Sequence, residues 1–117
     1  MFEVHGTAIC VSRGDTGLLT FTADGVSLTE NDRAVFTVKG RGGGVVIRKI
    51  IKPQENSVTV PFVSADTEAM RPGAYEWDIR YVLEAEMDGR GDVTDGREII
   101  TPFPPGKLTV VRTVGSV

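Results

Sequence analysis

The chain has 117 residues, a formal net charge of −3 and a single cysteine, Cys10. This length suits one domain spanning residues 1–117, and it is sufficient to bury a core without disulfides or structural metals. The acidic balance argues against nucleic-acid binding, the lone cysteine rules out an internal disulfide, and no apolar run reaches the roughly 18 residues of a membrane span.

Short apolar runs separated by Gly, Pro, Asn and Asp predict strands and give no strong helix signal. In chain order, the predicted strands are residues 3–12, 17–22, 34–39, 45–51, 57–63, 74–86, 97–101 and 107–114. This number of short strands with regular turns favours an all-β sandwich of seven or eight strands. We expect residues 115–117 to fray. The run Val45-Val46-Ile47 breaks the alternation of its strand, so we expect cover on both faces, with a partner subunit as one candidate cover.

The strand predicted from residue 74 carries both tyrosines and the only tryptophan. Tyr75, Trp77, Ile79 and Tyr81 share one face, which is the two-residue period of a half-buried strand. We predict that these four residues form the structural core together with Phe36 and Phe62. The preceding segment predicts a sharp corner. Asp66 would cap one helical turn by accepting a backbone N–H, Pro72-Gly73 would end it, and the Tyr75 hydroxyl would bond back to the preceding backbone.

Charged residues are unevenly distributed along the chain. A basic segment contains Arg41, Arg48, Lys49 and Lys52, whereas a predicted hairpin tip is acidic. The acidic candidates are Glu84, Glu86, Asp88, Asp92 and Asp95. One interpretation is ordinary solvated strand faces and loops. The other is a two-poled surface in which the basic segment of one copy contacts the acidic hairpin of another copy or of a neighbouring protein, which favours head-to-tail assembly.

Chemical motifs are weak throughout. The aspartates of the hairpin tip match no calcium-loop spacing, and Gly40-Arg41-Gly42-Gly43-Gly44 lacks the lysine and helix of a phosphate-binding loop. His5, the only histidine, lies an odd number of residues from Cys10 on a predicted strand, so the two would face opposite sides. We therefore predict no catalytic residue, no metal and no cofactor, and a protein that is not an enzyme.

A combination of segments resembles a known group of domains. The segments are Gly14-Asp15-Thr16, residues 32–39, Asp66-Thr67, Pro72-Gly73-Ala74-Tyr75-Glu76-Trp77-Asp78 and Gly106-Lys107-Leu108-Thr109-Val110. They resemble small immunoglobulin-like domains of phages and prophages of Gram-positive bacteria, including the N-terminal domain of baseplate upper proteins. The resemblance implies an immunoglobulin-like Greek-key sandwich, without catalytic residues.

In function, the resemblance implies a structural accessory protein of the phage tail or baseplate that acts through self-assembly and docking to other virion proteins. No signal peptide is visible at the N-terminus, so we expect synthesis in the bacterial cytoplasm and incorporation into the virion. The long C-terminal extension of the baseplate relatives is not matched, which puts direct host attachment in doubt. The alternative hypothesis is a carbohydrate- or cell-surface-binding sandwich. Phe103, which lies among prolines, would then be an exposed anchor.

Overall fold

The computed structural model describes residues 1–115, so most of the segment predicted to fray lies outside the described residues. Within this range the chain forms strands and one short helix. They are β1 Phe2–His5, β2 Ala8–Ser12, β3 Gly17–Thr22, β4 Arg33–Lys39, β5 Val45–Ile51, β6 Ser57–Phe62, α1 Ser64–Glu68, β7 Gly73–Leu83, β8 Glu86–Met87, β9 Val93–Asp95, β10 Glu98–Ile100 and β11 Gly106–Val111.

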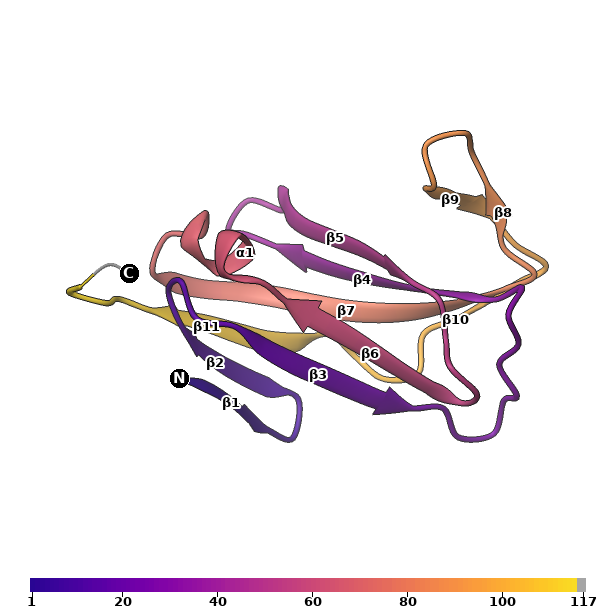
Figure 1. Cartoon of the computed structure of the whole chain (residues 1–117), viewed down its shortest axis with the longest axis horizontal. Helices are drawn as coiled ribbons and strands as arrows, with labels where there is room; N and C mark the ends of the chain where they lie inside the picture. The colour runs from indigo at the N-terminus through magenta and orange to yellow at the C-terminus, as the bar shows by residue number, and fades with distance from the viewer. Residues whose placement is uncertain (116–117) are drawn as a thin grey trace.

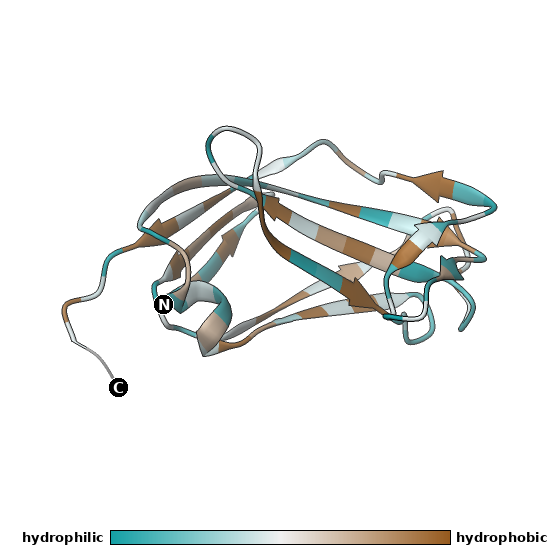
Figure 2. Cartoon of the chain, turned by 90° about the horizontal axis from the view of Figure 1, so that it is seen from above, coloured by the Kyte–Doolittle hydropathy of each residue, from teal (hydrophilic) through white to brown (hydrophobic). Residues whose placement is uncertain are grey.

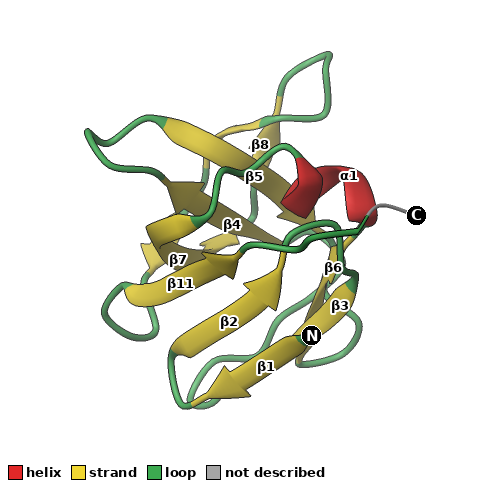
Figure 3. Cartoon of the chain, turned by 90° about the vertical axis from the view of Figure 1, so that its left-hand side faces the viewer, coloured by secondary structure: helices red, strands yellow, loops and turns green. Residues whose placement is uncertain are grey.

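Two sheets face each other across the core, which confirms the predicted all-β sandwich (Figure 1). The larger sheet has the order β1-β2-β11-β7-β4-β5, and β10 also pairs with β7. Figure 3 shows these strands stacked in this order, with β3 and β6 beside them as the second sheet. Strand β11 runs parallel to β2, whereas its other neighbour, β7, is antiparallel. The described part of the chain therefore forms one layered unit, with β8 and β9 standing apart as a separate hairpin.

The predicted strand over residues 3–12 is wrong, because this segment is a hairpin. Strand β1 pairs antiparallel with β2, and the turn between them contains Gly6 with a φ of 62°. Glycine adopts this left-handed conformation without the steric cost that a side chain brings. A single glycine between two apolar runs was too weak a turn signal to divide the segment.

The long strand predicted over residues 74–86 ends earlier, at Leu83. Glu84 takes a φ of 47°, which breaks the extended conformation and directs the chain into β8. Within β7 the predicted alternation is present, and Figure 2 shows the same banding of apolar and polar residues along several strands.

The core forms where the inner face of β7 meets the second sheet. Trp77, Ile79 and Tyr81 are buried, as are Phe36 and Phe62, which confirms these predicted core residues. Tyr75 is an exception because it is only half-buried and packs at the margin of the core. Aromatic contacts hold the centre together: the Trp77 ring lies 5.6 Å from that of Phe36 and 5.6 Å from that of Phe21, measured between ring centroids.

Trp77 also fixes the β1–β2 hairpin to the sheet. Its indole N–H donates to the carbonyl oxygen of Thr7 at 3.0 Å. Gly106 lies against both partners, since a Cβ placed there would approach the Thr7 oxygen to 2.3 Å and Trp77 Nε1 to 2.6 Å. A glycine is therefore required at the start of β11 for the hairpin turn to reach the indole.

The corner between β6 and β7 matches the prediction in part. Helix α1 runs from Ser64 to Glu68, so Asp66 lies within its first turn and not before it, and the helix ends ahead of Pro72-Gly73. The Asp66 carboxylate accepts the backbone N–H of Val63 at 2.8 Å, at the start of α1. The Tyr75 hydroxyl donates to the carbonyl oxygen of Arg71 at 2.6 Å, four residues upstream. Both bonds stabilise the turn by which the chain passes from the smaller sheet to the larger one.

Candidate interaction surfaces

The acidic segment forms the β8–β9 hairpin, and several of its carboxylates bond to its own backbone. Asp88 accepts the N–H groups of Arg90 at 2.8 Å and of Asp92 at 2.9 Å. Asp95 accepts the N–H of Gly96, also at 2.8 Å. These bonds shape the turn, and within residues 1–115 no group of three or more His, Cys, Asp or Glu residues is arranged to hold a metal ion.

The other two acidic candidates lie near the base of the hairpin. Glu84 lies 3.1 Å from Arg97, in an exposed ion pair. Glu86 lies on β8, exposed to solvent, opposite Asp95 in the strand register. The predicted acidic residues thus do come together on one hairpin, although Glu84 belongs to its base rather than to its tip.

Arg48 on β5 pins this hairpin to the larger sheet. Its guanidinium donates to Asp92 Oδ1 through Nη2 at 2.9 Å and through Nε at 3.2 Å. The bond from Arg48 lowers the pKa of the Asp92 carboxyl below its ordinary value of 3.8. The hairpin lies over outward-facing apolar side chains, because Val93 and Thr94 line one small hollow together with Val35 and Val82. The hairpin is therefore a cover for part of the outer face of the sheet.

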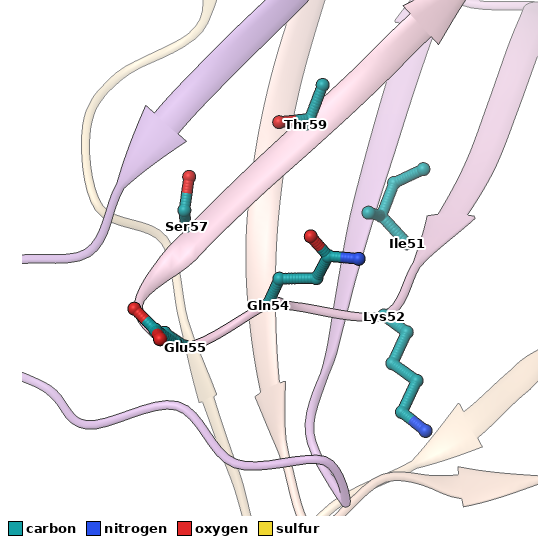
Figure 4. Close-up of a pocket in the computed structure, with 6 residues that line it drawn as sticks. All are labelled: Ile51, Lys52, Gln54, Glu55, Ser57 and Thr59. Atoms are coloured by element: carbon teal, nitrogen blue, oxygen red, sulfur yellow. The ribbon is translucent and has the colours of Figure 1, made fainter.

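The predicted basic segment does not form one patch. Lys49 lies on the opposite side of β5 from Arg48, and its ammonium group pairs with Asp66 of α1 at 2.6 Å. Lys52 follows β5 and lines a shallow hollow between β5 and β6. Figure 4 shows that Lys52 and Glu55 extend in different directions at this hollow, so they do not form a charged pair there. Only Arg41, in the β4–β5 loop, lies in a basic cleft.

This basic cleft is lined by Lys39, Arg41, Tyr75, Glu76 and Lys107 together with glycines of the β4–β5 loop, and it has a volume of about 400 Å³. The loop closes on itself through the N–H of Gly40, which donates to the carbonyl oxygen of Gly44 at 2.9 Å. The Tyr75 ring approaches Gly40 closely, because a Cβ at this glycine would contact the ring at 3.6 Å. The cleft is therefore built on a tight turn and an anchored aromatic ring.

The register of the larger sheet explains the charges of the cleft. Lys39 on β4 and Lys107 on β11 lie directly opposite Glu76 of β7, one on each side. Lys39, Arg41 and Lys107 form no ion pair within residues 1–115. Lys39 and Lys107 were not among the residues predicted to bind a partner. Both lysines lie beside Glu76. They reach this position only when β4, β7 and β11, which are far apart along the chain, pair with one another.

The aromatic side chains give no open binding platform. Phe103 was predicted as an exposed anchor, but it is half-buried, and its ring lies 5.7 Å from Phe21 and 5.8 Å from Trp77. The prolines around it turn the chain back onto the core rather than away from it. Within residues 1–115 no Phe, Tyr or Trp residue is exposed, so a stacking surface for sugar rings is not observed.

His5 and Cys10 lie on two different strands of the β1–β2 hairpin, where His5 is opposite Ala8 and Cys10 is opposite Glu3. Cross-strand partners point to the same side of a sheet, so His5 and Cys10 share one face with Glu3, and the prediction that they face opposite sides is wrong. The reason is the turn at Gly6, which reverses the chain between them, and the His5 ring lies 3.7 Å from the Glu3 carboxylate. In the described range, 1–115, no helix has both the length and the apolar character needed to cross a membrane.

Comparison with known proteins gives limited information. No protein-family model matches the chain, and no curated protein matches it. Among solved structures, the chain is similar to one named a "putative glycoside hydrolase" from Bacteroides vulgatus, with 16% sequence identity and a TM-score of 0.48. The similarity covers 90% of this chain but 16% of the other.

Proposed function

We propose that this chain is a non-enzymatic, immunoglobulin-like structural module of a phage or prophage particle, which acts by docking to copies of itself or to neighbouring virion proteins. The observation that carries the proposal is the separation of charge along the molecule. The β4–β5 loop, which lines the basic cleft, lies toward one end of the long axis, and the acidic β8–β9 hairpin lies at the other (Figure 1). Surfaces of opposite sign steer partners together and fix their orientation.

The interior supports the same function. The aromatic side chains pack in or against the core, and Asp88 uses one carboxylate oxygen to shape its own turn. Apart from Asp32, which is buried, the charged side chains of residues 1–115 are exposed or half-buried, and exposed charges favour recognition of a partner. The phage context rests on the resemblance of the sequence segments described above.

Mass spectrometry of purified particles would test this function. Particles released by the bacterium that encodes the chain, after prophage induction, are expected to contain it in a fixed ratio to their tail proteins. Recovery of the chain from the cell lysate but not from the particles would contradict the proposal.

Light scattering of the purified chain at low and high salt would test the role of charge. Association that depends on exposed charges weakens as salt rises, because screening shortens their range to about 8 Å at physiological ionic strength. Salt-insensitive assembly would indicate apolar contacts instead.

A further inference from the structure

We propose that the basic cleft receives the acidic β8–β9 hairpin of a second copy, so that copies of the chain join head to tail. This inference deepens the docking function proposed above and rests on it, because it names the partner of one end of the molecule. It also replaces the simpler idea that the whole basic segment makes the contact, since Arg48 and Lys49 are already paired within their own chain.

The cleft carries positive charge that the described chain leaves unbalanced. Glu76 is the acidic side chain that lines it, with Lys39 on one side and Lys107 on the other. Arg41 adds a further cation at the rim. Because none of these three cations forms an ion pair within residues 1–115, an incoming carboxylate can bind without breaking an existing pair. A site whose cations are already paired with carboxylates of the same chain would have to break those ion pairs before it could bind a partner.

The hairpin offers the matching charge in a compact shape. Glu86, Asp88 and Asp95 are exposed on it, and they outnumber Arg90. Asp92 holds the hairpin against Arg48 and is therefore not needed for the contact. The Asp88 bonds to the turn backbone keep the tip in one conformation, which reduces the entropy that docking would otherwise cost.

The positions of the two surfaces determine how copies join. The hairpin and the cleft lie toward opposite ends of a molecule that is 45 Å long, so a hairpin cannot reach the cleft of its own chain. Two different surfaces that bind each other across copies make a heterologous contact, which continues into a ring or a filament.

Two neutralising variants test this arrangement. Lys39→Gln/Lys107→Gln weakens the cleft and leaves the hairpin intact. Glu86→Gln/Asp88→Asn/Asp95→Asn weakens the hairpin and leaves the cleft intact, while the asparagine oxygens still accept the N–H bonds of the turn. Sedimentation velocity at low salt should show each variant associating at least about tenfold more weakly than the wild type. An equimolar mixture of the two should form pairs that stop at two copies, because one competent junction remains.

The matched control for the cleft variant is Lys52→Gln/Arg112→Gln, which likewise removes two positive charges, at exposed residues that do not line the cleft. This control should associate like the wild type. Urea unfolding of every variant would verify that it folds. The proposal is overturned if either neutralising variant assembles like the wild type, if the folded mixture stays monomeric, or if the control loses association equally. A wild-type chain that is monomeric at low salt would also overturn it, whereas the mass spectrometry of particles would still decide the broader function.

Discussion

The outer face of the larger sheet has two halves that differ in one respect, the presence of a cover. Where the β8–β9 hairpin lies over the sheet, Val35 and Val82 point outward and yet are 7% and 3% exposed. Toward the other end, beyond the hairpin, the row across the sheet reads Lys107, Glu76, Lys39 and Val45, and Val45 is 55% exposed. The covered half thus buries two valines beside Arg48 and Arg80, whereas the open half leaves its lysines, Glu76 and Val45 exposed to solvent.

This difference indicates which half is available to a partner. The valines of the covered half need no partner protein to bury them. The β8–β9 hairpin already removes them from water, and Arg48 holds the hairpin in place. The open half keeps side chains that favour water or an oppositely charged surface. Residues 1–115 do not supply the predicted second cover over Val45 and Val46, since both are exposed, so cover by a partner subunit stays a prediction.

The largest loss of stability is expected from a substitution in the core, which lies beneath both halves of the sheet. Trp77 lies on the inner face of β7, beneath the open half, and also holds the β1–β2 turn. Trp77→Ala should lower the free energy of unfolding by about 3–5 kcal/mol, because it empties the core and leaves the Thr7 carbonyl without its donor. Urea unfolding followed by circular dichroism would measure the loss. A variant as stable as the wild type would show that this strand face is not the centre of the core.

A matched pair of substitutions tests the covered half against the open half directly. Val82→Ala should cost about 2 kcal/mol, because two buried methyl groups are lost beneath the hairpin. Val45→Ala makes the same chemical change at an exposed residue and should cost less than about 0.5 kcal/mol. Thermal or urea unfolding of both variants under identical conditions provides the comparison. Equal losses would mean that the hairpin does not cover the sheet.

A substitution at Tyr75, whose ring lines the basic cleft, should have a smaller effect on stability. Tyr75→Phe removes the hydroxyl that donates to Arg71, and the loss in unfolding free energy should be about 1 kcal/mol. The ring itself remains, so the cleft should keep its shape. Unfolding measurements together with the self-association of the variant would separate the two properties. Lost association with unchanged stability would assign the hydroxyl to docking rather than to the corner.

The smallest effect concerns the contact that pins the hairpin. Because the pKa of Asp92 is lowered in the folded state, its ion pair with Arg48 stabilises the hairpin fully above pH 3.8, and this contribution is lost as the pH falls through the lowered pKa. The protection of the Val93 amide against hydrogen exchange, taken relative to the intrinsic exchange rate at each pH, should therefore fall only in that acidic window. In the Arg48→Gln variant, the pKa of the Asp92 carboxyl, measured by NMR titration, should rise toward its ordinary value. An unchanged midpoint would show that Arg48 does not hold this carboxylate.

The sequence predicted the core more completely than it predicted the charged surfaces. The alternation of Trp77, Ile79 and Tyr81 and the corner around Asp66 and Tyr75 depend on neighbours within a few residues, so their pattern is visible in the sequence. The β1–β2 turn was missed because it contains one glycine and no other strong turn residue.

The charged surfaces were only partly predicted. The residues that form them are brought together by strand pairing between distant parts of the chain. Proximity in the chain grouped Arg48, Lys49 and Lys52, whereas the alternation of β5 sends the first two to opposite faces. Conversely, Lys39 and Lys107 are distant in the chain and lie on either side of Glu76 only once β4, β7 and β11 have paired. Sequence spacing alone does not contain that register.

The parallel pairing of β2 with β11 has a consequence for how the molecule forms. Ile9 pairs with Leu108, so β2 is synthesised long before the strand that it pairs with in parallel. Contacts of such long sequence separation slow folding, since the loop must close before the pairing stabilises it. Until then this edge of β2 lacks its partner, and an unpaired strand edge is a place where incompletely folded chains can pair with one another.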